Sequence, residues 1–360
     1  MKNVLLTTTA LVAFAGTAFA AAHEGGPTIT FSGDAEVKYN DAIDAIALAD
    51  GDPEYGIFSA EANLDIAASI ALNNGITAGA TYGISLGDGT GISGDALPVV
   101  FLESAYGKLS AGNGDAIGPA SDHFSDTSGV SGFADGAYDA DTDLAVRADV
   151  SFSGIDFSVS TSDLTDGATI PEDTRFGASG AFGSFDFGLG YAMDVDGLGT
   201  TEMGVNVGTS FSGFDVDFSY FDSDASGADY GIEVGYAISS SITVGAYYAS
   251  VNDAADTEFG VSVGYASGPL GVDLSYDDGS SAAQEITLDV SYEVMADLTV
   301  FAGYKSINPA PVAPDADGGY VGVEYDLGNG AKAWASYSEY DEAGGPEFDD
   351  GITVGVSVEF

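Results

Sequence analysis

The chain contains no cysteine and is poor in basic residues, histidine and tryptophan. Without cysteine it can form no disulfide, no thiol nucleophile and no thiolate metal site. No apolar run of about 18 residues follows the N-terminal segment, which excludes transmembrane helices from the mature chain. Neither a phosphate-binding glycine motif nor a zinc-ligand spacing occurs, so the sequence predicts no enzyme and no cofactor of these kinds.

Acidic residues dominate the charge. The 360 residues include 57 Asp and Glu against 7 Lys and Arg, which gives a net charge of −50 and predicts no nucleic-acid partner. Nevertheless 45% of the residues are hydrophobic, and they are spread evenly along the chain. A soluble acidic protein of this length would gather them in one core. Their even spread predicts a wide apolar belt instead.

Apolar residues return at every second position in one segment after another. In the last ten residues, Ile352, Val354, Val356, Val358 and Phe360 alternate with polar residues or glycine. A strand points successive side chains to opposite faces, so each segment has one apolar and one polar face. About twenty such strands without a helix between them predict an all-β, transmembrane antiparallel β-barrel with a water-filled interior.

The first twenty residues have a different pattern. Lys2 precedes an apolar stretch from Val4 to Phe14, and Ala18-Phe19-Ala20 offers a small-residue cleavage site. This is typical of a secretory signal peptide. We expect residues 1–20 to be removed and residues 21–360 to form a single barrel domain. Removal of Lys2 leaves 6 − 57 = −51 charges.

Turn lengths and aromatic residues support the barrel. Seven hairpins after residue 141 have short internal turns, such as Gly183-Ser184, and longer Asp-, Gly- or Pro-containing connections to the next hairpin. Short turns at one rim and long loops at the other are typical of outer-membrane barrels. Phe and Tyr residues also recur beside both kinds of connection, as expected for aromatic girdles at the two membrane interfaces.

The chain resembles the Gram-negative general porins of the Rhodobacter type, found in alphaproteobacteria. The resemblance rests on the amphipathic first strand around Thr30–Asp34, the short glycine turn within Tyr106–Gly112, and the terminal Phe360, which is similar to the outer-membrane assembly signal. It covers the mature chain in architecture. Family members have 16 strands, whereas counting strands by parity gives 20 here. Either some of these hairpins lie outside the barrel, or this barrel is wider than those of the family.

The resemblance implies an outer-membrane porin that lets small hydrophilic solutes diffuse passively. It implies a homotrimer in contact with outer-membrane lipid and lipopolysaccharide, inserted by the outer-membrane assembly machinery. It also implies that the third long loop folds into the pore as a constriction. Here that loop is the break in alternation at residues 113–141, which carries six carboxylates and no basic residue. These are Asp115, Asp122, Asp126, Asp135, Asp139 and Asp141. A solvated surface loop is the alternative.

The few basic residues lie on the polar parity of their strands, including Arg175. Lys38 and Arg147 match places where the family has basic constriction residues, and they are expected to face the loop across the pore. The corresponding positions on the second and fourth strands carry Glu61 and Glu103 instead. An acidic pore attracts cations and repels anions, so a cation preference is expected.

Calcium is a weaker possibility. The segment from Asp222 and Asp224 to Glu233 fits the EF-hand spacing, but its flanks read as strands rather than helices. Loose calcium binding by Asp222 and Asp224, or by Asp315 and Asp317, stays open.

Three other functions are alternatives. A substrate-specific channel of the same fold needs a track of aromatic residues in the lumen, and Trp334 alone is a poor track. An outer-membrane hydrolase would use His123. A catalytic triad, however, is a spatial arrangement, and residues next to each other in the sequence rarely form one. A secreted β-solenoid or adhesin would repeat at one fixed period.

Overall fold

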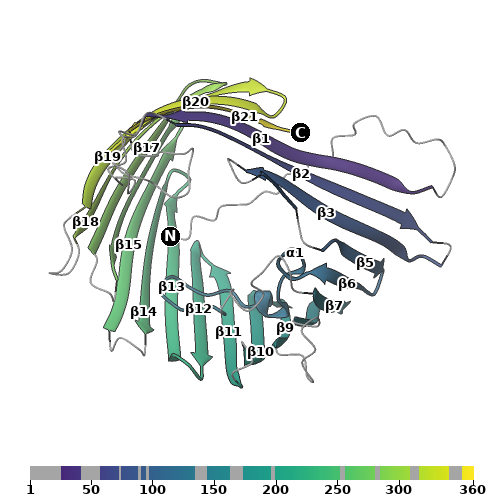
Figure 1. The fold of residues 1–360 in the computed structure, drawn as a ribbon. Helices are drawn as coiled ribbons and strands as arrows, with labels where there is room; N and C mark the ends of the chain where they lie inside the picture. Colours follow the sequence, from purple (N-terminus) through teal and green to yellow (C-terminus); the bar gives the residue numbers. More distant parts are fainter. Residues whose placement is uncertain are drawn as a thin grey trace, which may run out of the picture.

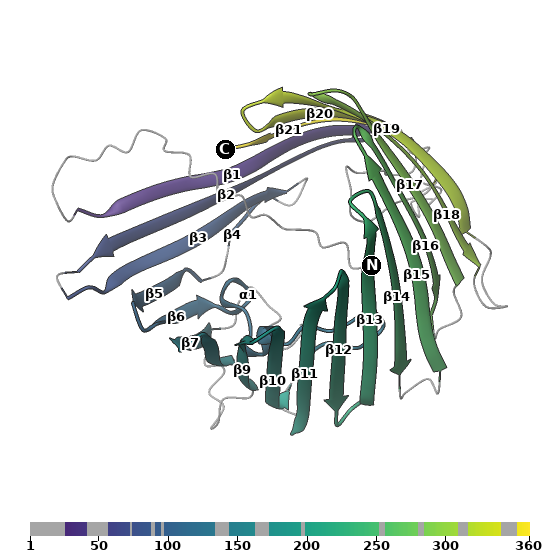
Figure 2. The same cartoon turned by 180° about the vertical axis from the view of Figure 1, so that it is seen from behind.

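The computed structural model describes residues 26–41, 57–72, 74–87, 91–94, 97–133, 144–162, 173–195, 199–251, 256–279, 284–308, 316–339 and 351–360. The expected signal peptide lies outside these residues. Figures 1 and 2 show the described chain as one sheet curled into a ring. No helix in this part of the chain is long and apolar enough to cross a membrane.

The strands follow the chain in order, with two short helices after the sixth. They are β1 (Thr28–Asn40), β2 (Ile57–Ala71), β3 (Thr77–Gly87), β4 (Gly91–Gly94), β5 (Val99–Ser104), β6 (Gly107–Asn113), α1 (Gly114–Ile117), the 3₁₀ helix η1 (Ala120–His123), β7 (Leu144–Phe152), β8 (Ile155–Ser162), β9 (Asp173–Phe182), β10 (Phe185–Val195), β11 (Thr200–Phe211), β12 (Phe214–Ser223), β13 (Gly227–Ser239), β14 (Ile242–Val251), β15 (Asp256–Ser267), β16 (Leu270–Asp278), β17 (Gln284–Met295), β18 (Leu298–Asn308), β19 (Ala316–Gly328), β20 (Ala331–Ser338) and β21 (Gly351–Glu359).

Twenty of the 21 strands in the described residues close into a barrel. Each pairs antiparallel with its neighbour in the chain, and β21 pairs with β1 to complete the ring. The short β4 pairs with the end of β3, beyond the residues of β3 that pair with β5, so β4 and β5 share one position in the ring. The predicted antiparallel barrel and the parity count of 20 strands are therefore confirmed.

The strand register keeps apolar side chains on the outside. In β21, Val354 and Val356 pair with Ala335 and Ala333 of β20, and all four point outward. The alternate positions point inward and carry Trp334 and Gly355. The outward valines are 48% and 45% exposed, as expected for a surface that is not covered within one chain. Period two in the sequence thus becomes an apolar exterior and a polar interior.

The turns at one rim are tight because their residues accept left-handed backbone angles. Ser153 and Gly154 have φ of 56° and 83°, and Ser212 and Gly213 have φ of 53° and 83°. Two successive positive φ values define the type I′ turn, whose twist matches that of the flanking strands. These turns therefore set the register of the hairpins that they close.

The strand number sets the width of the barrel. Twenty strands spaced ~4.8 Å apart and tilted by ~40° enclose a ring about 40 Å across between backbones. Sixteen strands of the same tilt would give about 32 Å. The additional strands thus widen the interior that the loop after β6 enters, as Figure 1 shows for α1.

The last residue of the chain takes part in closing the ring. The backbone N–H of Phe360 donates to the carbonyl of Gly33, and the N–H of Gly33 donates to the carbonyl of Phe360, both at 2.8 Å. The β1–β21 ladder continues from Asp34 paired with Glu359 to Asn40 paired with Thr353. Phe360 therefore secures the end of the seam between the first and last strands.

We predict that deleting Phe360 lowers the yield of closed barrel. The deletion removes a reciprocal pair of backbone hydrogen bonds, each worth about 1 kcal/mol, and opens an edge at the seam. The measurement is the fraction of heat-modifiable protein in SDS gels, run with and without boiling, from detergent-extracted membranes. Phe360→Tyr, which keeps the backbone pair and an aromatic ring, is the control. A normal yield of the deletion variant would contradict this role.

Candidate functional site

The loop after β6 lies along the inside of the barrel wall. We call its described residues, 114–133, the inner loop. It begins at α1, where the Asn113 side chain accepts a hydrogen bond from the N–H of Ala116 at 3.0 Å. It continues through η1, which packs against β8, β9 and β10. The prediction that the third long loop folds into the pore is confirmed.

Glycines on the inner face of the wall make room for this loop. We call five of them the glycine track: Gly177 of β9, Gly188 and Gly190 of β10, Gly204 of β11 and Gly231 of β13. A Cβ on Gly177 would lie 1.8 Å from the carbonyl oxygen of Ala120, and one on Gly188 would lie 2.0 Å from that of His123. No side chain fits at such distances. The track is therefore a shaped seat for the backbone of the loop.

Sequence analysis missed the glycine track, although a signal for it exists. Its members share the inward parity of their strands and occur in strands that follow one another closely. Each also falls where a polar side chain would normally face water. Such glycines indicate close approach of another backbone.

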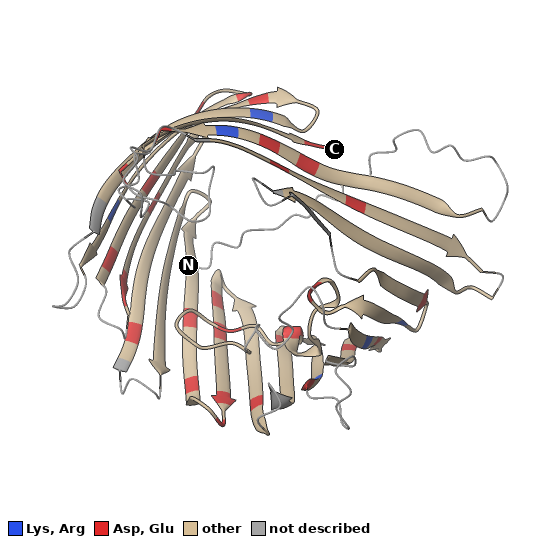
Figure 3. Cartoon of the chain, in the orientation of Figure 1, with Lys and Arg blue, Asp and Glu red and all other residues tan. Residues whose placement is uncertain are grey.

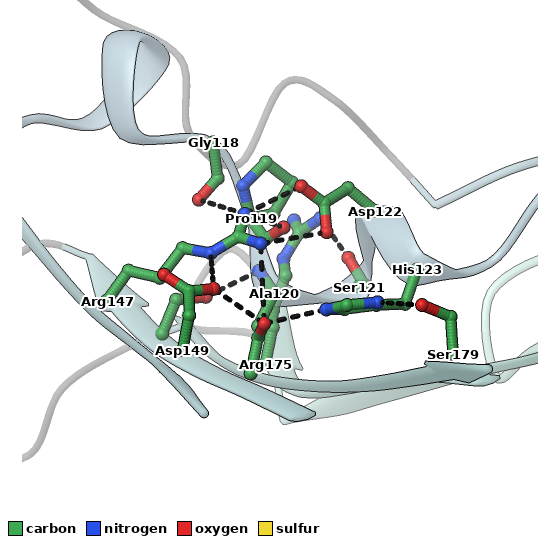
Figure 4. Close-up of polar contacts among 12 residues, drawn as sticks. Gly118, Pro119, Ala120, Ser121, Asp122, His123, Arg147, Asp149, Arg175 and Ser179 are labelled. Carbon is green, nitrogen blue, oxygen red and sulfur yellow. Dashed lines mark hydrogen bonds and ion pairs between the residues drawn. The ribbon is translucent and has the colours of Figure 1, made fainter. Parts of the chain in front are cut away.

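Arg147 of β7 binds the inner loop at its root (Figure 4). Its Nη1 donates to Asp122 Oδ2 at 2.6 Å and to the carbonyl of Pro119 at 3.0 Å, and its Nη2 donates to Asp122 Oδ1 at 3.2 Å. Its Nε donates to Asp149 Oδ1 at 2.7 Å. The Arg147 side chain is only 13% exposed. Arg147 thus lies beneath the loop and not across the pore from it, contrary to our expectation from the sequence.

Arg175 of β9 is buried behind the same part of the loop. Its Nη2 lies 2.9 Å from Asp173 Oδ2, and its Nη1 donates to the hydroxyl of Ser121 at 3.4 Å. The residue is 0% exposed, so solutes cannot contact its guanidinium. Arg175 therefore joins the loop to the wall and does not itself line the free lumen.

His123 ties η1 to the wall through two serines. Its Nδ1 lies 2.6 Å from the hydroxyl of Ser179, and its Nε2 lies 2.7 Å from that of Ser158. Ser158 donates its own proton to Asp149 at 2.6 Å, so Ser158 accepts from His123 Nε2. A catalytic triad would need the carboxylate on the histidine rather than on the serine. The arrangement is therefore an anchor, and it does not have the geometry of a hydrolase.

The other predicted loop and wall residues are more dispersed. Asp115 is exposed on α1, and Asp126 is partly exposed farther along the loop. Lys38, Glu61 and Glu103 lie on β1, β2 and β5, whereas the inner loop is bound by β6 to β13. Another three predicted carboxylates lie outside the described residues: Asp135, Asp139 and Asp141.

The calcium candidates do not form an EF-hand. Asp224 stands in the short connection between β12 and β13, and its Oδ2 accepts hydrogen bonds from the Thr201 hydroxyl at 2.7 Å and the Thr201 N–H at 2.9 Å. These bonds, the hydroxyl first, lower the pKa of Asp224. Asp222 lies in β12 and Asp317 in β19, whereas Asp315 lies outside the described residues. Within the described part of the chain, no three His, Asp or Glu side chains gather as metal ligands.

Comparison with known proteins gives one family and several structural neighbours. The family model for Gram-negative porins matches residues 7–342. A triple mutant of the Rhodopseudomonas blastica porin shares 15% identity with a TM-score of 0.45, covering 92% of this chain and 100% of its own. A mutant of the same porin with five substitutions shares 16% identity with a TM-score of 0.44 and the same coverage. No curated protein matches the chain.

We predict that Arg147→Ser loosens the start of the inner loop and leaves Asp122 and Asp149 without their basic partner. Each charged hydrogen bond lost costs about 1.5–3 kcal/mol. We expect faster cleavage of the folded barrel by chymotrypsin at Phe124 and Phe133, together with a higher cation-to-anion permeability ratio. Arg147→Lys keeps the positive charge but loses the planar guanidinium that donates several hydrogen bonds at once. It should therefore speed cleavage with little change in the ratio. Unchanged cleavage of the Ser variant would contradict the anchoring role.

Proposed function

This chain belongs to the Gram-negative porin family, and we propose that it lets small hydrophilic solutes diffuse passively, screened by size and charge, with cations preferred. Membership of the family and the closed barrel identify it as a channel of the outer membrane. The observation that carries the proposal is the arrangement of the barrel, which is apolar outside and polar inside with a loop bound along the inner wall. Diffusion through such a pore requires no energy source.

The pairing of the basic residues supports cation preference. Arg147 and Arg175 contact Asp122 and Asp173 as described above. Lys305 lies 3.0 Å from Glu285, and Lys332 lies 3.3 Å from Glu324. Four of the seven basic residues are thus neutralised by neighbouring carboxylates. Asp and Glu positions, red in Figure 3, occur on strands around the ring, and their excess over Lys and Arg then determines the sign of the field.

Carboxylates also face each other directly across neighbouring strands on the inner face. Five such pairs occur in the strand register of the described residues: Asp34 with Glu359, Glu36 with Glu61, Asp217 with Glu233, Asp273 with Asp289, and Asp277 with Glu285. Like charges directly opposite each other destabilise a sheet unless counter-ions are near. A lumen built in this way favours cations along its wall.

We predict that Asp273→Asn/Asp289→Asn lowers the preference for cations. In water, a negative unit charge ~8 Å away lowers the energy of a passing cation by about 0.5 kcal/mol and raises that of an anion by as much. The ratio of cation to anion permeability should therefore fall about fivefold at low salt for each charge removed. The measurement is the reversal potential across a tenfold KCl gradient in a planar bilayer. The effect should shrink in 1 M salt, where the Debye length is ~3 Å.

Ser275→Asn is the matched control for this experiment. Ser275 lies on the same inner face of β16, between Asp273 and Asp277, and the change adds an amide without altering charge. Its permeability ratio should equal that of the wild type. An anion-selective wild type would overturn the proposed preference for cations.

The homotrimer remains part of the proposal, and the outer face of the barrel supports it. Near the seam this face is rich in alanine, and the residues on it are Ala35 of β1, Ala60, Ala62 and Ala68 of β2, Ala78 and Ala80 of β3, and Ala331, Ala333 and Ala335 of β20. Small side chains let another barrel approach closely within the membrane. We propose that this face contacts neighbouring protomers and that the remaining outer wall contacts lipid and lipopolysaccharide.

We predict that Ala62→Trp dissociates the oligomer, because an indole ring on this flat face prevents close contact. Ala246→Trp places the same ring on the outer face of β14, on another part of the wall, and should leave the oligomer intact. The measurement is the mass of the detergent-solubilised complex by light scattering. Equal masses for the two variants would refute this choice of interface.

A further inference from the structure

Burial of side chains along the inner loop repeats every three residues. After Ala120, which is buried as well, the buried side chains of the loop are Ser121, Phe124, Thr127 and Val130, and Phe133 continues the series with partial burial. The residues between them are exposed or only partly buried. The N–H of Phe124 donates to the carbonyl of Ser121 at 3.0 Å, and the N–H of Val130 donates to that of Thr127 at 3.1 Å. Turns closed between residues i and i+3 bring the two side chains of each pair to the same side. The loop therefore has one side that faces the wall and another that faces the lumen.

An apolar cluster holds the wall-facing side. Phe124, Val130 and Ala249 are buried around Phe221, and Phe133 packs against them. The ring centroids of Phe124 and Phe133 lie 5.6 Å apart, and those of Phe133 and Phe221 lie 5.2 Å apart. Phe221 points inward from β12, where a water-filled pore would wet it, yet it is only 2% exposed. The loop covers it, so burial of these rings stabilises the bound position of the loop.

The wall also binds the backbone of the loop along most of its length. Wall side chains accept hydrogen bonds from backbone N–H groups of the loop. These are Ser160 from Ala120 at 2.8 Å, Asn206 from Ser125 at 2.9 Å, Ser219 from Thr127 at 2.9 Å, Glu233 from Ser128 at 3.4 Å, and Asp229 from Ser131 at 3.4 Å. These acceptors come from β8, β11, β12 and β13. Together with the glycine track, which adds β9 and β10, they hold the loop against six consecutive strands.

We propose that Phe124 and Phe221 are positioning residues of the pore: their contact keeps the inner loop immobile, so that its free side acts as a fixed part of the channel wall. The inference rests on the proposed function, because it assumes a conducting pore. When the contact is lost, the loop is released from the glycine track for part of the time. While it is released, it enters the path of the solute. The expected consequence is a pore whose current fluctuates rather than one that fails to assemble.

Two variants break the contact from opposite sides. Phe124→Ser removes the ring from the loop. Gly204→Val acts from the wall, because a Cβ at Gly204 would lie 2.7 Å from Phe124 Cδ2 and 2.8 Å from Phe133 Cε2. Valine suits a strand, so the second variant tests the contact even if the first one folds poorly. Gly235→Val is the matched control, since this inward glycine of β13 has no atom nearer than 3.8 Å to its added Cβ.

The experiment records single channels in planar bilayers for wild type and the three variants. Loss of a buried aromatic ring should raise the population of released loop on the order of a hundredfold. We expect steady steps for wild type and Gly235→Val, and added current noise with substates for Phe124→Ser and Gly204→Val. The fraction of heat-modifiable protein should be the same in all four proteins.

A disulfide provides the rescue. The hydroxyls of Thr127 and Ser219 lie 2.7 Å apart across the loop and the wall, and both residues are buried. Thr127→Cys/Ser219→Cys places two thiols within reach of a bond, and the chain has no other cysteine to compete. Added to Phe124→Ser, the oxidised pair should restore steady steps, and its reduction should bring the noise back.

The outcomes separate the inference from the function on which it rests. A wild type that forms no pore would overturn the proposed function. A conducting wild type with equally steady Phe124→Ser and Gly204→Val channels would overturn the positioning role. Noise that the disulfide fails to suppress would also overturn it, because release of the loop would then not be its source.

Discussion

The structure depends on one constraint, which is that the backbone polar groups of a chain inside a membrane must find partners within the protein. A sheet meets this constraint only when it has no free edge, and here the closing pair is β1 with β21. The reciprocal hydrogen bonds between Gly33 and Phe360 complete that seam. Once the ring is closed, the outer face can be apolar and the inner face polar throughout, and 20 strands make the interior wide.

A wide interior allows part of the chain to return inside it. The inner loop is bound by four kinds of interaction: close backbone contact over the glycine track, hydrogen bonds from its N–H groups to wall side chains, the apolar cluster around Phe221, and the side-chain contacts of Arg147, Arg175 and His123. Each is common in the interior of a soluble protein. Their presence within a pore creates a small packed core on one side of the lumen, so the loop belongs mechanically to the barrel wall.

The electrostatics follow from how the few basic residues are used. Arg147 and Arg175 bind the loop and its neighbouring carboxylates, and therefore contribute little free positive charge to the lumen. Lys305 and Lys332 are paired as well. The acidic excess of the composition is thus expressed on the inner wall, where directly opposed carboxylates such as Asp273 and Asp289 meet across strands. The same few basic residues therefore affect both the anchoring of the loop and the charge selectivity of the lumen.

The sequence by itself determined the barrel and the face that each side chain occupies, because alternation along a strand is a local property. The strand number was decided by the tertiary structure, in which all 20 strands counted by parity belong to the closed ring. The same alternation placed Arg147, Arg175 and Lys38 inside and showed where the long loop interrupts the strands. Only the tertiary structure decided what these residues contact. The partner of Arg147 is Asp122 on the loop, and the seat of Ala120 is Gly177, 57 positions away along the chain. Such contacts depend on strand register and on the path of the loop, and these arise from packing between distant segments that no local pattern encodes.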